Sequence, residues 1–295
     1  MTYSNAAQAA ILAATEVVPA DWRDLSTALE SCGGPEALIT DSYMDDDCRS
    51  GLMPYLRSAI DPARLKYWER KLAALAKRDN PAKFIAVTDR EYPQNLRQAF
   101  GRPPFIFVAG SLQPSDSRSI AIVGSRDASE LGLGIANKLA ADLASSNVTV
   151  VSGLARGIDA AAHQGAIMAG GRTLAVVATG IDHPPSKETD ASVAKLIPGN
   201  GAVISRFRPG SPPSKSSFVL RNSVISGLSL ASVIVEAGER SGTRTEADFA
   251  IQQGRKVLLW EPSFRHQRWI KTFAQNSLVS MVDSTEGVLE VLGEG

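Results

Sequence analysis

The sequence predicts an α/β protein, with a doubly wound and mainly parallel sheet preceded by a small helical domain. Residues 1 to about 80 contain no convincing strand, whereas short apolar runs separated by turns begin at Phe84. Helical patterns fall between most of these runs, and strands that alternate with helices are typical of a parallel sheet covered by helices. Two runs, at Ile120 and Val148, are almost continuously apolar, as expected of strands buried on both faces. We therefore expect a helical domain over residues 1–80 and a sheet domain over residues 81–295.

Apolar side chains at helical spacing predict the elements of the first domain. The run Ala6–Ala14 indicates one helix, and a second one around Trp22 ends at Gly33-Gly34-Pro35. A third helix is expected over Pro62–Lys77, and the acidic, small-residue segment Asp41–Gly51 is expected to be a loop.

In the sheet domain, the apolar runs are predicted as strands and the segments between them as helices. The expected strands are Phe84–Val87, Phe105–Val108, Ile120–Val123, Val148–Val151, Thr173–Val177, Ala202–Ile204, Ser232–Val235 and Lys256–Trp260. The expected helices are Leu131–Ala144, Gly157–Met168, Ala191–Leu196 and Thr243–Gln253.

Composition and charge limit the function classes. The chain has 295 residues with 31 Lys and Arg against 31 Asp and Glu, so a diffuse basic surface is excluded and any nucleic-acid contact must be concentrated in one place. Ala6–Ala14 has no basic flank and no segment is long enough to span a bilayer, so we expect a cytoplasmic protein with no membrane contact. Cys32 and Cys48 have no CxxC spacing and no His cluster nearby. We expect them to be free thiols, with no metal site and no disulfide framework.

Two glycine turns, each accompanied by an arginine, follow the two most apolar strands. Gly124-Ser125-Arg126 follows the first, and Ser152-Gly153, with Arg156 close behind, follows the second. A glycine at the carboxyl end of a strand lets the backbone approach a ligand, while free N–H groups of the next helix point toward it. Either turn alone is weak evidence, because tight turns also use glycine. Together, the two turns favour phosphate or nucleic acid as the ligand.

A basic segment without acids provides a second signal. Residues 191–235 contain no Asp or Glu but carry Lys195, Arg206, Arg208, Lys215 and Arg221. Ligands of open parallel sheets bind beyond the carboxyl ends of the strands, so we expect these cations to converge there with the two arginine turns. The alternative is a solvated loop with scattered charges.

Many short blocks of residues resemble one family. They are Tyr92-Pro93 with Leu96, Pro103-Pro104-Phe105, Gly124-Ser125-Arg126, Ser152–Asp159 with Ala162-His163, Gly170–Thr173, Gly180-Ile181-Asp182, Phe218 with Arg221-Asn222, Ser226–Ser229, Val235-Glu236-Ala237, Ser241-Gly242-Thr243 and Gly254-Arg255. From about Phe84 onward the chain resembles the DNA-processing protein A family (DprA, also called Smf). This family falls within the Rossmann-like nucleotide-binding proteins that include LOG-type phosphoribohydrolases.

The resemblance implies a function in DNA processing. Members of the family bind and protect single-stranded DNA and help to load the RecA recombinase during transformation. It therefore implies single-stranded DNA, a RecA-type recombinase and a second copy of the chain as partners, with no cofactor. The residues we expect at phosphate and DNA are Gly124, Ser125, Arg126, Ser152, Gly153, Arg156, Arg206, Arg208, Lys215, Arg221, Asn222, Ser241, Gly242 and Thr243.

Two aromatic residues and two departures from the family pattern add to this interpretation. Phe207 and Phe218 lie in the basic segment, where they are candidates for stacking on bases, although burial in the core is favoured for Phe218. The family usually has Ser-Glu where this chain has Ser205-Arg206, and Arg-Asn-Arg where it has Arg221-Asn222-Ser223. The departures leave open whether the pathway is transformation, general recombination or phage defence.

An enzyme is the rival interpretation. Gly242-Thr243-Arg244-Thr245-Glu246 resembles half of the LOG-type turn, whose glutamate helps to cleave an N-glycosidic bond. Thr243 and Glu246 also have the spacing of a helix capping box, and we favour the cap. His163 is expected in the core, and no catalytic constellation is apparent, so we expect no catalytic residue. A dinucleotide-dependent oxidoreductase is disfavoured, because the first turn lacks the full glycine fingerprint.

Overall fold

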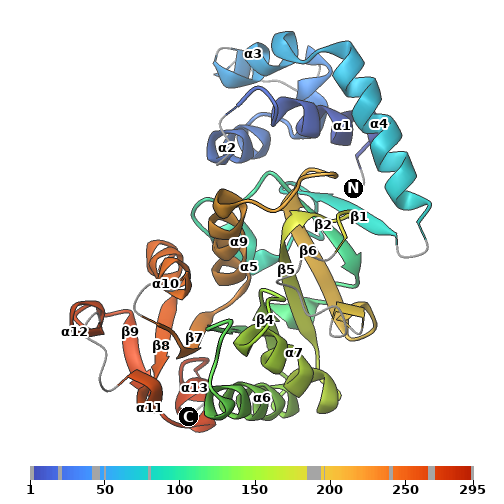
Figure 1. The fold of residues 1–295 in the computed structure, drawn as a ribbon. Coiled ribbons are helices and arrows are strands. Elements are labelled where there is room, and N and C mark those ends of the chain that lie inside the picture. The colour runs from blue at the N-terminus through green and yellow to red at the C-terminus, as the bar shows by residue number, and fades with distance from the viewer. Residues whose placement is uncertain are drawn as a thin grey trace.

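In the residues that the structure, a computed structural model, describes, nine strands form one sheet, which is flanked by helices and preceded by a helical N-terminal domain (Figure 1). It describes residues 3–18, 22–41, 47–49, 51–78, 81–184, 194–195, 197–238, 242–264 and 270–293. The predicted α/β class with a mainly parallel, doubly wound sheet is therefore confirmed. Within the described ranges, no helix is both long enough and apolar enough to cross a bilayer.

The N-terminal domain forms the blue layer at the top of Figure 1. Its helices are α1 (Asn5–Ala14), α2 (Arg23–Ser31), α3 (Leu52–Ala59) and α4 (Pro62–Ala76), with 3-10 turns at η1 (Pro35–Leu38) and η3 (Asp47–Arg49). α4 begins where Asp61 accepts a hydrogen bond from the Ala63 N–H at 2.8 Å, followed by a proline whose missing N–H costs nothing in the first turn.

The two cysteines are joined, contrary to our expectation of free thiols. A disulfide links Cys32, which follows α2, to Cys48 in η3, with Cα atoms 5.5 Å apart. The sequence spacing carries no signal for this bond, because only the fold of the connecting loop brings the two residues together.

The sheet confirms all eight predicted strands and adds a ninth. The strands are β1 (Ala82–Ala86), β2 (Phe105–Gly110), β3 (Ser119–Gly124), β4 (Thr149–Ser152), β5 (Thr173–Gly180), β6 (Gly201–Phe207), β7 (Ala231–Glu236), β8 (Lys256–Trp260) and β9 (Val279–Val282). Their spatial order is β1-β2-β6-β5-β4-β3-β7-β8-β9. β1 and β2 pair antiparallel to each other, and β2 pairs antiparallel to β6, while the pairs from β6 to β9 are parallel.

Helices cover both faces of this sheet. They are α5 (Gln94–Gln98), α6 (Glu130–Ser145), α7 (Ile158–Met168), α9 (Lys215–Leu228), α10 (Thr243–Gln252), α11 (Glu261–Phe264), α12 (Ile270–Phe273) and α13 (Thr285–Glu290), with 3-10 turns η4 (Pro114–Ser117) and η5 (Ile197–Gly199). Successive residues of β3 point to opposite faces, so Ile120 and Ile122 pack with α6 and α7, whereas Ala121 and Val123 belong to the core on the other face. Most of the expected helix Ala191–Leu196 lies outside the described residues.

One core connects the helical domain to the sheet. Trp22 contacts Phe105 of β2 with ring centroids 5.6 Å apart, and Phe84 of β1 stacks on the same Phe105 at 5.2 Å. These rings belong to a continuous cluster of buried side chains that also includes Leu72 and Leu75 of α4. The antiparallel end of the sheet is thus fixed against the N-terminal helices.

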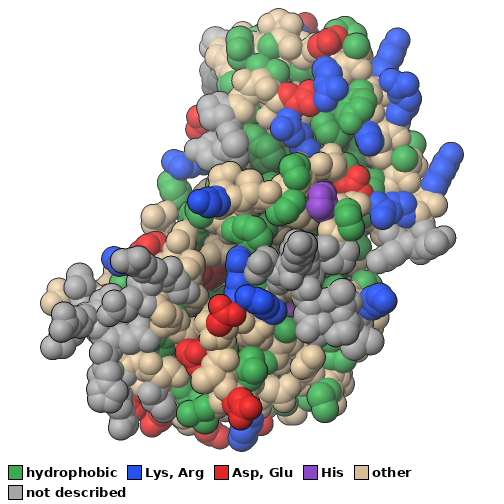
Figure 2. Space-filling view, viewed as in Figure 1, with side chains coloured by type: hydrophobic (Ala, Val, Ile, Leu, Met, Phe, Trp, Pro, Cys, Tyr) green, Lys and Arg blue, Asp and Glu red, His purple; other side chains and the backbone are tan. Residues whose placement is uncertain are grey.

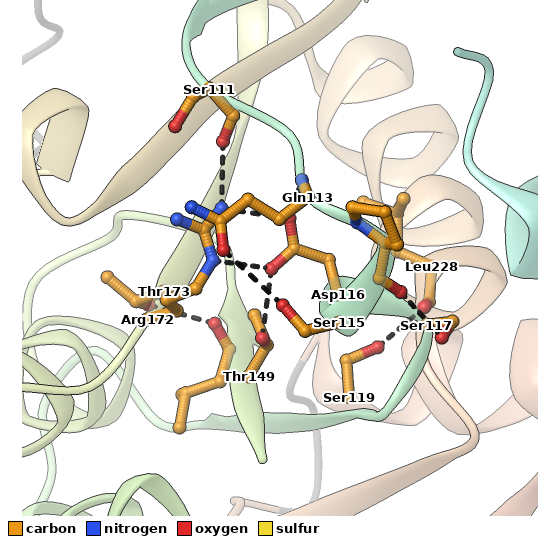
Figure 3. Close-up of polar contacts among 12 residues, drawn as sticks. Ser111, Gln113, Ser115, Asp116, Ser117, Ser119, Thr149, Arg172, Thr173 and Leu228 are labelled. Carbon is orange, nitrogen blue, oxygen red and sulfur yellow. Dashed lines mark hydrogen bonds and ion pairs between the residues drawn. The ribbon is translucent and has the colours of Figure 1, made fainter. Parts of the chain in front are cut away.

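A polar hub lies at the amino edge of the parallel strands (Figure 3). The Asp116 carboxylate, in the turn before β3, accepts hydrogen bonds from Arg172 Nε at 2.8 Å, from Thr149 Oγ1 at 2.9 Å and from the Gln113 N–H at 2.8 Å. Thr149 begins β4 and Arg172 precedes β5. One carboxylate therefore ties together the segments that lead into β3, β4 and β5 at this edge.

The chain reverses its direction across the sheet between β3 and β7. From β3 it proceeds through β4 and β5 to β6, then returns to place β7 on the other side of β3 and continues to β9. At the carboxyl end of this pair, the register shifts between Val123 and Gly124, opposite Glu236. A reversal of strand order opens a crevice beyond the strand ends, where ligands of such sheets bind.

Candidate nucleic-acid interface

A cavity of about 550 Å³ lies at this reversal point. Its walls come from the ends of β3 and β7 and from the helices α7, α9 and α10. The lining residues are Val123, Gly124, Ser125, Arg126, Asp127, Ala155, Asp159, Phe218, Val219, Arg221, Asn222, Ile225, Gly238, Gly242, Thr243, Thr245 and Glu246.

Glycines make room for the tight backbone around the cavity. A Cβ atom on Gly124 would lie 2.5 Å from Ile158 Cγ1 and 2.8 Å from the Glu236 carbonyl oxygen. Gly157 has φ +83°, and a Cβ atom there would lie 2.3 Å from the Ser125 carbonyl oxygen. The two glycine turns predicted from the sequence therefore pack against each other, which brings both to the same edge of the sheet.

Arg126 stands at the mouth of the cavity. Its side chain is exposed, and its guanidinium carbon lies 4.8 Å from the centroid of the Phe218 ring. A guanidinium held over an aromatic face keeps its hydrogen-bond donors at the edge of the plane, where they can meet a phosphate. Phe218 thus lines the cavity, although burial in the core was favoured from the sequence. Of the two phenylalanines, Phe207 is buried in the core, with 8% of its surface exposed.

Arg221 forms the cationic part of the floor. It lies in the middle of α9 and is 6% exposed; its Nη1 donates to the Val176 carbonyl at 3.2 Å and lies 3.9 Å from Asp159 Oδ2. Burial lowers the pKa of Arg221, although a guanidinium keeps its charge in proteins. Gly153 provides the space, because a Cβ atom there would lie 1.5 Å from Arg221 Nη1. Arg221 therefore reaches the cavity from a buried position within the helix.

Two buried carboxyl groups flank Arg221. Burial raises the pKa of Asp159, against the lowering effect of Arg221. Burial also raises the pKa of Glu246 to about 8, because the side chain is 1% exposed and its Oε1 only accepts from Ser232 Oγ at 3.3 Å. Glu246 Oε2 lacks a hydrogen-bond partner. At neutral pH the floor therefore carries one positive charge and fewer than two negative charges.

Glu246 does not cap α10, so the favoured interpretation of its spacing is wrong. The residue before the helix is Gly242, with no side-chain capping bond, and Thr243 is already the first helical residue. Glu246 therefore lies one position too far along the helix to reach back to the capping residue, and its side chain points into the interior instead.

The cavity brings together about half of the residues expected at DNA. Gly124, Ser125, Arg126, Arg221 and Asn222 line it, as do Gly242 and Thr243, and Gly153 lies directly behind Arg221. Asn222 reaches across the cavity, since its Nδ2 donates to the Gly242 carbonyl at 3.4 Å. Ser241 lies outside the described residues.

The remaining expected residues do not line the cavity. The Ser152 side chain is fully buried and donates to the Ile122 carbonyl at 2.6 Å. Arg156 is exposed nearby and pairs with Asp127 at 3.0 Å, whereas Lys215 is exposed at the start of α9.

Two cations of the basic segment have structural roles. Arg206 is 1% exposed, donates to Ser223 Oγ at 3.1 Å and lies 5.6 Å from the Trp22 ring, so it joins α9 to the helical domain. Arg208 lies 3.6 Å from Glu16 of the helical domain. The expected convergence of the whole segment therefore does not occur, because the N-terminal domain engages these two side chains.

Sequence reasoning missed Asp159 and misjudged Phe218. Asp159 was noted only as part of a family block, and an acid gives no signal for a phosphate site. His163 is buried as expected: its Nδ1 lies 2.7 Å from Thr173 Oγ1, and burial lowers its pKa to about 3. Among the described residues, no group of three or more His, Cys, Asp or Glu could hold a metal ion.

The family model of DNA recombination-mediator protein A matches residues 83–290, which is more than half of the chain. The chain belongs to this family. The match includes every cavity residue, so the site lies within the part that defines the family. The family model describes a recombination mediator and a curated relative is named a DNA processing protein, in agreement with the expectation of a DNA-processing protein.

Curated relatives confirm the resemblance to DprA and Smf. The chain is 33% identical to the DNA processing protein DprA of Streptococcus pneumoniae over 195 residues, 65% of this chain and 68% of that protein. It is 34% identical to Protein Smf of Escherichia coli over 223 residues, 74% of this chain and 59% of that protein. It is 41% identical to a putative DprA of Mycobacterium tuberculosis over 188 residues, 59% of this chain and 48% of that protein. The matched segment thus spans about half to two thirds of these relatives.

Solved structures of DNA processing protein A have the same fold as this chain. The X-ray structure of DprA from Streptococcus pneumoniae superposes with a TM-score of 0.73 at 26% identity, covering 98% of both chains. The DNA processing protein A of Helicobacter pylori, studied for its single-stranded DNA binding mode, has the same fold, with a TM-score of 0.62 at 20% identity over 72% of this chain and 95% of that one.

Proposed function

We propose that this chain is a single-stranded DNA-binding protein, and that the cavity between β3 and β7 holds the DNA backbone. The observation that carries the proposal is the placement of Arg126 over Phe218 at the mouth, with Arg221 on the floor. A single strand offers phosphates to cations and unstacked bases to aromatic faces, and this cavity has both kinds of group.

The geometry favours a single strand over a duplex. Phosphate contacts fix a strand in place but carry no sequence information, and a protein that reads a duplex needs an element to enter a groove. The cavity is a recess among the ends of β3 and β7 and the helices α7, α9 and α10, and a recess does not enter a groove. We therefore expect binding without sequence preference. The single-stranded DNA named for the Helicobacter pylori relative supports the same ligand class.

Fluorescence anisotropy tests the proposal directly. A labelled oligonucleotide of mixed sequence is titrated with protein as a single strand and as the matching duplex, at several salt concentrations. We expect the single strand to bind more tightly by an order of magnitude or more, with an affinity that falls linearly on a log–log salt plot. Equal affinity for the duplex, or an affinity indifferent to salt, would contradict the proposal.

The pathway and the partners form a finer proposal. Membership of the recombination-mediator family supports a role in protecting single-stranded DNA and in loading a RecA-type recombinase, in transformation, recombination or phage defence. We also propose a homodimer, which sedimentation of the full chain at micromolar concentration tests: a monomer across that range would contradict it.

A further inference from the structure

The helix α4 concentrates positive charge on a chain whose net charge is zero. Between Pro62 and Arg78 the sequence has six Lys or Arg residues and a single acid, Glu69. The helix runs along the upper right edge of the molecule in Figure 1, and Lys and Arg side chains project from the same edge in Figure 2.

Three of these cations share one exposed line, which we call the α4 stripe: Lys66, Arg70 and Lys77. They are spaced four and seven residues apart, so they fall on one side of the helix and its last turn. The buried side chains of α4, Trp68 and Leu72 among them, face the opposite side. With a rise of 1.5 Å per residue, the stripe is about 16 Å long.

The stripe starts near the edge of the sheet that carries the cavity. Arg78, just beyond α4, donates from Nη1 to the Asp182 carbonyl at 3.4 Å, and Asp182 follows the carboxyl end of β5. Asp182 Oδ1 in turn accepts from the Gly210 N–H at 2.6 Å, in the loop after β6. The end of α4 is therefore attached to the loops that follow two strands of the parallel sheet, at the same carboxyl edge as the cavity.

A second link fixes the direction of α4. Arg64, in its first turn, donates from Nε to Glu16 Oε2 at 2.9 Å, and the same carboxylate lies 3.6 Å from Arg208 after β6. Because Arg64 precedes the buried Trp68 by four residues, it falls on the buried side of α4, and Glu16 therefore lies away from the α4 stripe. The helix thus presents a line of positive charge beside the carboxyl edge of the sheet.

We propose that the α4 stripe binds the sugar-phosphate backbone of single-stranded DNA that leaves the cavity, so that one strand contacts both domains. The inference rests on the proposed function of the cavity. Regularly spaced exposed cations attract a polyanion, and a strand needs cations that track its backbone beyond the first binding pocket. The stripe has Ala73 and no large apolar side chain between its cations, so it suits a phosphate backbone better than a membrane surface.

Two oligonucleotide lengths separate the stripe from the cavity. A strand of about 6 nucleotides suffices to fill one pocket, whereas a strand of about 30 nucleotides can also reach α4. The test variant is Lys66→Gln with Lys77→Gln, which removes two charges but keeps good helix formers. The control is Lys138→Gln with Lys256→Gln, which removes the same charge at exposed positions of α6 and β8, away from α4.

For the long strand, we expect the stripe variant to bind about tenfold more weakly at physiological salt, with a salt slope smaller by about 1.4. For the short strand, the stripe variant should match the wild-type protein, and the control should match it for both lengths. Equal loss in the stripe and control variants, or no loss in either, would overturn the inference while leaving the cavity proposal intact. No binding of either length by the wild-type protein would overturn both. An acidic peptide serves as a further probe. If the stripe variant lost affinity only for this peptide, the stripe would be assigned to a protein partner and the inference would be overturned.

Discussion

The carboxyl group of Glu246 is buried in the interior, where it accepts a hydrogen bond from Ser232 Oγ. Its pKa is raised to about 8 from 4.5, so the folded chain holds a proton that the unfolded chain loses above about pH 4.5. The folded state therefore loses stability as the pH rises from about 4.5 to about 8, because the unfolded chain gains the free energy of ionising Glu246 while the folded chain still holds the proton. Arg221 and Asp159 face the same group and remain in any Glu246 variant.

Glu246→Gln should remove this pH dependence. We expect the melting temperature of the variant, relative to the wild-type protein, to rise by several degrees between about pH 5 and about pH 8, since glutamine stays neutral throughout. Differential scanning calorimetry of both proteins over this range measures the gap. A constant gap would mean that Glu246 is ionised in the folded chain.

A variant of Arg221 tests the cationic part of the cavity floor. Removing Arg221 leaves Asp159 buried without its closest cation, and breaking such a pair costs about 3–5 kcal/mol. We therefore expect Arg221→Ala to unfold at a lower urea concentration than the wild-type protein. Adding Asp159→Asn should restore part of the loss, because the uncompensated charge is gone. Equal stability of Arg221→Ala and the wild-type protein would contradict the buried pairing.

At this scale the sequence predicted residue types better than their environments. Arg126 and Arg221 were both expected at the ligand, and both line the cavity, because each follows from a local motif. The burial of Arg206 and the interior position of Glu246 depend on which segment packs against them. Trp22, which covers Arg206, is far away in the chain, so no local pattern could reveal it.

At the scale of elements, the turn after β4 needs glycine at position 153, because a side chain there would occupy the space of Arg221. Because a Cβ atom on Gly153 would lie 1.5 Å from Arg221 Nη1, Gly153→Ala should displace the guanidinium, lower stability and weaken DNA binding. Gly134→Ala is the matched control: Gly134 lies within α6 with nothing within 4 Å of its Cβ position. We expect the control to gain about 0.5–1 kcal/mol, as alanine does over glycine in a helix. Urea unfolding and anisotropy of both variants measure the contrast, and similar behaviour would contradict it.

Strands were easier to predict than helices in this chain. The eight predicted strands are mostly apolar runs rich in β-branched and aromatic residues, a signal that burial makes strong. β9 is four residues long, with Ser280 and Met281 exposed at the edge of the sheet, so it lacks that signal. α9 is buried through serines and Arg221 as well as apolar residues, which hides its helical period.

At the scale of the whole molecule, the sheet order determines the site. Alternating strands and helices predict a parallel sheet, but many strand orders are compatible with the same pattern. The pairing of β7 with β3 depends on contacts between segments that are far apart in the sequence. Only that pairing brings the end of β3 next to α9 and α10. The sequence could therefore indicate the edge of the sheet at which DNA binds, but not the five segments that form the cavity.

The central claim is that the cavity between β3 and β7 binds the phosphates of single-stranded DNA. The most direct test is the salt dependence of single-strand affinity for the wild-type protein and Arg126→Ala, measured by anisotropy with the same oligonucleotide. Arg126 is exposed, so the variant should melt at the wild-type temperature. We predict weaker binding and a log–log slope smaller by about 0.7, the loss of one phosphate contact. An unchanged slope and affinity would contradict the account.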